Sequence, residues 1–145
     1  MELIPIKQHL HENEEFINHP DCSKNLQMCI DFYERVGFNP PWICYYVQEG
    51  DQLVAAAAFK GKPVDNKVEI AYGTFDQYQN LGIGAKVADA LVKLALKTDL
   101  TVRVTAQTLK EENYSVKILR KNNFVLIGTA MDEDEGEVWE WEYQP

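Results

Sequence analysis

The chain has 145 residues, 46% hydrophobic and 26% charged, a balance that is ordinary for a globular protein. Its formal net charge of −9 disfavours nucleic acid and anionic membranes as partners and mildly favours cationic ones. No apolar run reaches the roughly 18 residues of a membrane span, and residues 1–11 lack the basic-then-apolar layout of a signal peptide. We therefore expect a single cytoplasmic domain over residues 1–145.

Cysteine and histidine residues give no sign of a metal site. Cys22, Cys29 and Cys44 are odd in number and lack the pairing of zinc ligands, so we expect free thiols. His9 and His11 form an H-x-H pair, but no Cys or Asp follows at ligand spacing. We expect no bound metal.

The first half of the chain predicts a strand, a helix and a hairpin. MELIPIK, residues 1–7, predicts a short strand, and residues 21–36 carry apolar side chains close to helical spacing. WICYYVQ and LVAAAAFK flank Glu49-Gly50-Asp51 and predict a β-hairpin, whose context overrides the helix preference of the alanines. The acidic runs Glu12–Glu15 and Asp132–Glu137 are expected to be solvated loops.

The second half predicts a strand, a helix, a strand, a short helix and a hairpin. KVEIAYGTF predicts the first strand, and residues 85–97 predict a helix with its charged residues on one face. TVRVTAQT alternates as a strand does. Residues 111–123 predict the short helix, with Asn123 suited to its left-handed end. FVLIGTAM and EVWEWEY then flank an acidic turn.

A strand, glycine turn, helix and strand form a crossover unit, so its two strands should be parallel and right-handedly connected. The hairpins on either side are antiparallel. The sequence therefore predicts an α/β (α+β) fold: a mixed, twisted, mostly antiparallel sheet with a central parallel strand pair and helices on both faces.

Two glycines, Gly82 and Gly84, stand where the crossover strand leads into its helix. Each weakens a helix start by roughly 0.5–1 kcal/mol relative to alanine. The first turn of a helix has free N–H groups and partial positive charge, and glycines let a phosphate approach them. We predict a phosphate-bearing cofactor here, with a tight turn without ligand as the alternative. A P-loop would need a hydroxyl after Lys86, and a dinucleotide site a glycine at Val87.

The run QNLGIG resembles the pyrophosphate-binding signature of the GNAT superfamily, the acetyl-CoA-dependent N-acetyltransferases. Like the family's motif, it follows a strand and opens a helix. The family's next block is matched by Asn113, Ser115, Lys121 and Phe124. GEVWEWEY resembles the last strand of the branch that includes ribosomal-protein alanine acetyltransferases. The resemblance covers about Val68–Tyr143. From Met1 to Lys67 it rests only on the order of the elements.

The resemblance implies which residues hold acetyl-CoA. The pantetheine arm would bond strand backbone at Tyr72, Gly73 and Thr74. The pyrophosphate would follow Gln79 and Asn80 and meet the N–H groups of Leu81, Gly82, Ile83, Gly84 and Ala85. Asn113 would bond the pantetheine and Ser115 would lie near the thioester. Helix capping is the alternative for Asn113 and Ser115.

An amine must lose a proton before it attacks a thioester, and a carboxylate can take that proton. Glu69 lies near where some family members carry such a base, on the strand face that Ala71 and Gly73 leave open; a structural acid is the alternative. Many relatives protonate the departing thiolate with a Tyr five residues before the Phe, where this chain has Leu119. Ser115 or water could replace it, with Tyr114 and Tyr72 as weaker candidates.

The sequence therefore predicts an acetyl-CoA-dependent N-acetyltransferase acting by direct attack in a ternary complex. Its acceptor would be a primary amine of a protein N-terminus, a lysine or a small molecule, with the acidic balance favouring cationic ones. The missing Tyr keeps open an alternative, a non-catalytic acyl-CoA-binding module. Aromatic strand ends at Trp139–Tyr143, expected to be exposed, are compatible with a homodimer.

Overall fold

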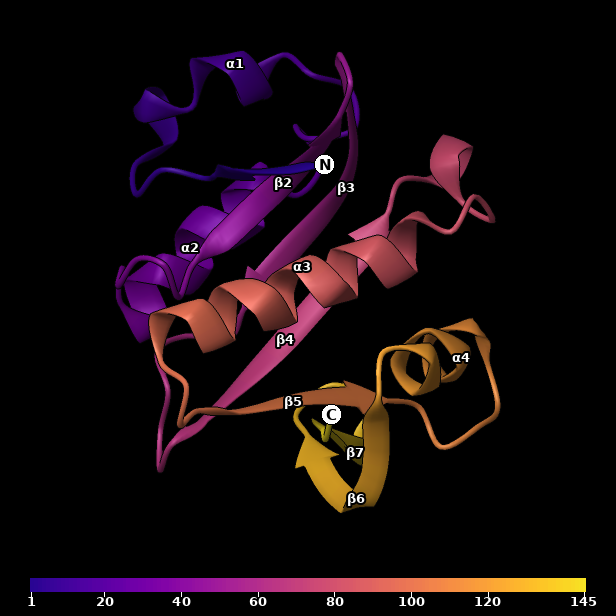
Figure 1. Cartoon of the computed structure of the whole chain (residues 1–145). Coiled ribbons are helices and arrows are strands. Elements are labelled where there is room, and N and C mark those ends of the chain that lie inside the picture. Colours follow the sequence, from indigo (N-terminus) through magenta and orange to yellow (C-terminus); the bar gives the residue numbers. More distant parts are fainter.

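Seven strands form one sheet in the computed structural model, which describes residues 1–145 (Figure 1). Their order is β1-β2-β3-β4-β5-β7-β6. The strands are β1 (Glu2–Pro5), β2 (Cys44–Glu49), β3 (Gln52–Phe59), β4 (Lys67–Thr74), β5 (Arg103–Thr108), β6 (Phe124–Asp132) and β7 (Gly136–Tyr143). All neighbours are antiparallel except β4 and β5, which confirms the predicted mixed sheet with a central parallel pair.

Helices cover both faces of this sheet. They are α1 (Glu14–Ile17), α2 (Leu26–Val36), α3 (Ile83–Thr98) and α4 (Tyr114–Lys121), with 3₁₀ turns η1 (Leu10–Glu12) and η2 (Asp76–Tyr78). Figure 1 shows α3 in front of β3 and β4, with α2 behind the sheet. None of these helices has the length and apolar character that crossing a membrane requires.

Helix α3 has the predicted amphipathic character. Lys86, Lys93 and Lys97 are exposed, whereas Val87 and Leu91 are fully buried. Burial of each such apolar side chain contributes about 1.5–3 kcal/mol, so the face packed on β3 and β4 outweighs the weak start of the helix.

Two expectations about the N-terminal half are wrong. The helix predicted from residue 21 begins at Leu26, because Asn25 leaves the helical conformation and its side chain accepts a hydrogen bond from Tyr46. This is a tertiary contact that periodicity does not reveal. The acidic run Glu12–Glu15 is not a loop but the end of η1 and the start of α1, anchored by buried Phe16 against Tyr46.

The expectation that Trp139–Tyr143 exposes aromatic side chains is wrong, because Trp141 is 1% exposed and Trp139 and Tyr143 pack against the core. β7 lies between β5 and β6 and has no free edge.

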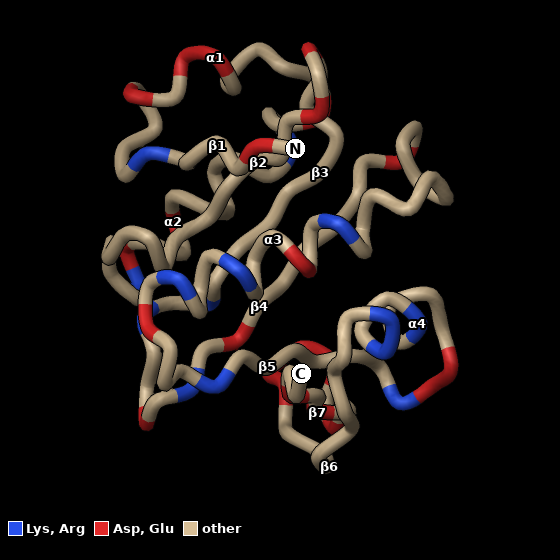
Figure 2. The backbone as a smooth tube through the Cα atoms, in the orientation of Figure 1, with Lys and Arg blue, Asp and Glu red and all other residues tan.

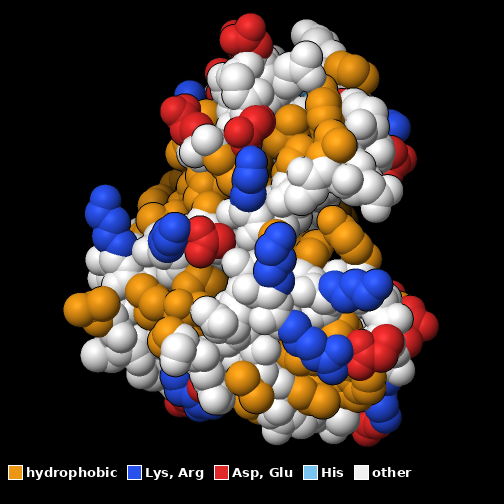
Figure 3. Space-filling view, turned by 45° about the vertical axis from the view of Figure 1, so that its right-hand side comes forward, with side chains coloured by type: hydrophobic (Ala, Val, Ile, Leu, Met, Phe, Trp, Pro, Cys, Tyr) orange, Lys and Arg blue, Asp and Glu red, His pale blue; other side chains and the backbone are white.

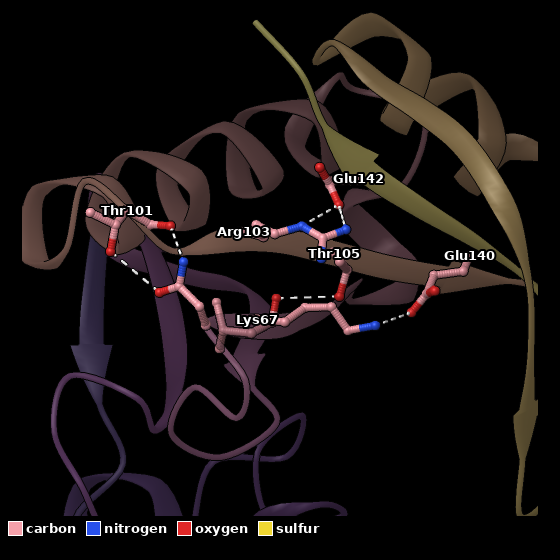
Figure 4. A network of polar contacts seen from close by, with 8 residues as sticks. Lys67, Thr101, Arg103, Thr105, Glu140 and Glu142 are labelled. Atoms are coloured by element: carbon pink, nitrogen blue, oxygen red, sulfur yellow. Dashed lines mark hydrogen bonds and ion pairs between the residues drawn. The ribbon is translucent and has the colours of Figure 1, made fainter.

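The joint between β4 and β5 positions the site. Only three residue pairs join the strands, the last being Glu69 with Thr105. A polar network surrounds this joint: the Thr105 hydroxyl donates to the Val68 carbonyl at 3.3 Å, and Lys67 reaches Glu140 of β7 at 3.1 Å (Figure 4). Beyond the joint the two strands diverge (Figure 1), so the edge that β4 turns toward β5 has no strand partner there.

Candidate functional site

A cavity of about 120 Å³ lies where β4 and β5 diverge. It brings together Glu69 and Tyr72 from β4 with Ser115 and Leu119 from α4. The remaining lining residues are Lys60, Ile70, Ala71, Ala106, Gln107 and Thr108. The structure therefore gathers at one place the residues predicted to act as base and as thiolate partner.

Glu69 sits on β4 between Val68 and Ile70, both buried, and its own side chain is 23% exposed. Its carboxylate forms an ion pair of 2.8 Å with Lys60, which follows the end of β3. The Glu69 carboxylate is therefore part-exposed and borders the cavity. The ammonium of Lys60 is the cation that balances the charge of this carboxylate.

Lys60 is the site residue that sequence reasoning missed. It lines the 120 Å³ cavity and also its two neighbours, of about 280 and 370 Å³. A lone lysine after a hydrophobic strand carries no motif. Only the antiparallel pairing of β3 with β4, which places Lys60 beside Glu69, could have indicated it.

The adjoining cavity of about 280 Å³ opens under the β6–β7 turn. Ser115 and Asn113 line one side and Asp132 and Glu135 the other. Backbone N–H groups of Glu135 and Asp134, together with the charge of Lys60, hold the pKa of Asp132 below its usual range. Asp132 is therefore charged at neutral pH and the rim on this side is anionic.

Tyr72 and Leu119 differ in what they offer to a leaving group. Burial raises the pKa of Tyr72, so its hydroxyl keeps its proton and is available as a hydrogen-bond donor. Leu119 is buried and forms only apolar wall. Ser115 is exposed and lines both cavities, whereas Tyr114 lines neither.

Asn113 is the N-cap of α4. Its side-chain oxygen accepts a hydrogen bond of 3.0 Å from the Val116 N–H, which is the capping geometry left open as an alternative. Its side chain also borders the 280 Å³ cavity. The role of Asn113 in binding pantetheine stays a prediction. Because the side-chain oxygen serves as the cap, pantetheine would have to bond the side-chain NH₂ group.

Helix α3 starts without a side-chain cap. Its N-cap is Gly82, in the left-handed region at φ +78°, and an added Cβ there would meet no atom within 4 Å. The N–H groups of Ile83, Gly84 and Ala85 belong to the first turn, which a helix leaves unpaired. Gln79 folds back and donates to the Thr74 carbonyl at 3.3 Å, linking this turn to β4.

The second glycine of the motif has a different structural reason. A Cβ on Gly84 would lie 2.7 Å from the Cδ1 of Ile118 in α4, closer than real contacts allow. Nearby, Asn122 donates to the Ala85 carbonyl at 3.1 Å. A larger residue at position 84 would therefore force the end of the Ile118 side chain to move, whatever binds at the first turn of α3.

The three thiols are free, and none lines the cavities at the β4–β5 fork. Burial raises the pKa of Cys22 to about 12, so this thiol is protonated and a poor nucleophile. No group of three or more His, Cys, Asp or Glu side chains is placed to hold a metal ion.

Comparison with known proteins gives a family and a fold. The family described as "Acetyltransferase (GNAT) domain" matches residues 4–125. No curated protein sequence matches the chain. Among solved structures, aminoglycoside acetyltransferase AAC(6')-Ib with coenzyme A and kanamycin is similar at 17% identity and TM-score 0.70, over 98% of this chain and 93% of that one. In its complex with ribostamycin and coenzyme A, the match spans 63% of that chain.

Two further similar structures are of acetyltransferases named for other substrates. RimL, a ribosomal L7/L12 α-N-protein acetyltransferase, is similar at 17% identity and TM-score 0.68, over 97% of this chain and 90% of that one. A chimera of spermidine N-acetyltransferase SpeG from Vibrio cholerae and hSSAT is similar at 11% identity and TM-score 0.70, over 99% and 95%. At these identities the likeness establishes the fold.

Proposed function

This chain belongs to the GNAT acetyltransferase family, and from that premise we propose that it transfers the acetyl group of acetyl-CoA to a primary amine by direct attack. The observation that carries the proposal is the cavity at the β4–β5 fork. It is lined by a part-exposed acidic residue, Glu69, and by two hydroxyl-bearing residues, Tyr72 and Ser115, and the strand that supplies Glu69 leads through η2 to the uncapped start of α3.

Acetyl-CoA would bind along the fork. The uncapped N–H groups at the start of α3 suit its pyrophosphate, because a helix N-terminus attracts anions. The backbone of Tyr72, Gly73 and Thr74 pairs with β3 on one edge and lies beyond the last pair with β5 on the other, so this second edge could bond an extended ligand as a strand would. Figure 3 shows a notch in this side of the molecule, above the part that carries α4.

Proton transfers fall to residues of the fork. Acetyl-CoA supplies the activated acyl group. Glu69, directly or through a water, would accept the proton that the acceptor ammonium must lose before its nitrogen attacks. Tyr72 and Ser115 line the same cavity, and the hydroxyl of one of them would donate a hydrogen bond to the sulfur as it departs. Leu119 has no donor group and cannot make this hydrogen bond.

A cationic acceptor fits the charges of the site better than an anionic one. Asp132 and Glu135 line the cavity of about 280 Å³ that Ser115 also lines, where these two carboxylates outnumber the one cation, Lys60. Acidic residues also gather at α1 and the β2–β3 turn (Figure 2), so the field draws cations toward the molecule. Similar folds act on an aminoglycoside, on spermidine and on a ribosomal-protein N-terminus, and all three carry primary amines.

The alternative, a non-catalytic acyl-CoA-binding module, is favoured by one observation, the apolar wall that Leu119 provides where a proton donor is expected. Such a module would bind acetyl-CoA and never release CoA faster in the presence of an amine.

The test has two stages. Thermal unfolding is followed with and without acetyl-CoA; a hundredfold excess over the dissociation constant adds about 2.7 kcal/mol of stability. CoA release is then measured with spermidine, kanamycin, a free lysine and a peptide N-terminus. Amine-dependent release supports the enzyme, and stabilisation without release by any amine supports the binding module. An unchanged unfolding temperature at millimolar acetyl-CoA would contradict both.

A further inference from the structure

Lys60 is a primary amine of the chain itself that lies against the proposed base. Its ammonium is 2.8 Å from the Glu69 carboxylate, and its side chain is 41% exposed. Its backbone N–H also donates to the Glu69 carbonyl at 2.8 Å, directly beyond the last register pair of β3 with β4, Phe59 with Ile70. A backbone contact and a side-chain contact therefore hold this amine beside Glu69.

No other lysine of the chain has this position. Lys60 is the one lysine that lines the 120 Å³ cavity, in which Glu69 is the one acidic residue. Tyr72 and Ser115, which are proposed to stabilise the leaving thiolate, line the same cavity. Neither this cavity nor the one of about 280 Å³ is lined by the other ion-paired lysines, which are Lys67, Lys93 and Lys110.

We propose that the chain acetylates its own Lys60, an inference that rests on the proposed function and assigns a modification site within it. Lys60 passes one proton of its ammonium to the Glu69 carboxylate. Its nitrogen then attacks the thioester carbonyl carbon of acetyl-CoA, the carbon–sulfur bond breaks, and the electron pair leaves with the sulfur. The thiolate takes up a proton and the nitrogen gives up its second one. The products are Nε-acetyl-Lys60, free CoA and one proton.

Proximity favours this reaction over the acetylation of lysines elsewhere on the surface. Well-oriented groups in one molecule react at effective molarities of about 10⁵–10⁸ M, and the Lys60 amine already contacts the group that takes its proton. An external amine competes with Lys60 for Glu69, so self-acetylation is fastest when no acceptor is present. The modification replaces the positive charge of Lys60 with a neutral amide and frees the Glu69 carboxylate from its ion pair.

Peptide mass spectrometry tests the proposal. The protein is treated with a lysine deacetylase and then incubated with acetyl-CoA that carries a deuterated acetyl group, without any added amine. Lys60 should gain one label per chain. Lys62 is the matched internal control, because it is exposed, forms no ion pair and does not line the 120 Å³ cavity. It should be labelled only at the background rate of lysines that meet acetyl-CoA in solution.

Three variants locate the reaction, and circular dichroism verifies that each of them folds. Glu69→Gln should slow the labelling of Lys60 by roughly 10²–10⁴-fold, toward the rate at Lys62, because the amide cannot accept the proton. Lys60→Arg should remove the label, since position 60 then has no primary amine, and Lys62→Arg should leave the labelling of Lys60 unchanged. At saturating acetyl-CoA the rate constant for Lys60 should not change when the protein is diluted, because the amine and the cofactor site belong to one chain.

The outcomes separate this proposal from the proposed function. If spermidine releases CoA while Lys60 stays unlabelled, self-acetylation is wrong and the proposed function stands. Labelling of Lys60 that is as slow as that of Lys62, that survives Glu69→Gln unchanged, or that rises in proportion to the protein concentration overturns self-acetylation as well. If acetyl-CoA neither stabilises the chain nor acetylates any amine, the proposed function itself fails.

Discussion

Gly82→Leu tests whether Gly82 serves only the turn before α3 or also leaves room for a phosphate. Gly82 has φ +78°, and no protein atom lies within 4 Å of an added Cβ, so the substitution displaces nothing in the protein itself. The left-handed conformation costs a non-glycine residue about 1–2 kcal/mol. At about 2–4 °C per kcal/mol for a chain of this size, the unfolding temperature should fall by roughly 2–8 °C.

Gly50→Leu is a matched control for this variant. Gly50, in the β2–β3 turn, has φ +62° and also has no atom within 4 Å of an added Cβ, so its backbone strain should be similar.

The assay is thermal unfolding of the wild type and of both variants with and without acetyl-CoA. At a hundredfold excess over the dissociation constant, the wild type and Gly50→Leu should gain about 2.7 kcal/mol, or roughly 5–11 °C. Gly82→Leu should gain nothing, because its side chain occupies the space in front of the first-turn N–H groups. An equal shift in both variants would show that the pyrophosphate does not lie at this turn.

Three further predictions concern the fork and its support. Glu69→Gln should lower kcat by roughly 10²–10⁴-fold with the acetyl-CoA-induced stabilisation unchanged; a pH–rate profile identical to that of the wild type would remove Glu69 as the base. Tyr72→Phe should lower kcat more than Ser115→Ala does, because the Tyr72 hydroxyl is the more buried donor, and the reverse order would assign the thiolate to Ser115. Ile118→Ala should cost about 2–5 kcal/mol in urea unfolding, and Gly84→Ala should be more favourable in that background than in the wild type, since the Cδ1 it would strike is gone. Additive effects would mean that Ile118 does not constrain Gly84.

The central part of the fold follows from local sequence signals. The strand KVEIAYGTF, the glycine turn and the amphipathic α3 predict a right-handed crossover, and the structure has β4 and β5 parallel at that point. The Ala55–Ala58 run belongs to β3 because its neighbours on both sides are strands, as the hairpin context predicts. Asn123 takes the left-handed conformation predicted for it, at φ +65°.

What the sequence could not show depends on contacts between distant elements. The ion pair of Lys60 with Glu69 requires the register of β3 with β4, which no local pattern encodes. The exposed edge of β6 requires the strand order, in which β7 inserts between β5 and β6. A half-buried inner strand and an apolar edge strand have similar compositions, so FVLIGTAM did not reveal which of the two it is.

The two glycines of the motif have different physical roles. Together they link the proposed pyrophosphate site at the start of α3 to Ser115, which is proposed to stabilise the leaving thiolate. Gly82 takes the left-handed conformation that precedes α3 and leaves the space around its own Cα free of protein atoms. Gly84 lets Ile118 approach, and Asn122 fastens the end of α4 to the Ala85 carbonyl. Ser115 lies one helical turn before Ile118. A displacement of α4 therefore moves Ser115 relative to the N–H groups proposed to hold the pyrophosphate. Variants at the α3–α4 contact should alter kcat, even though none of the contact residues lines the 120 or the 280 Å³ cavity.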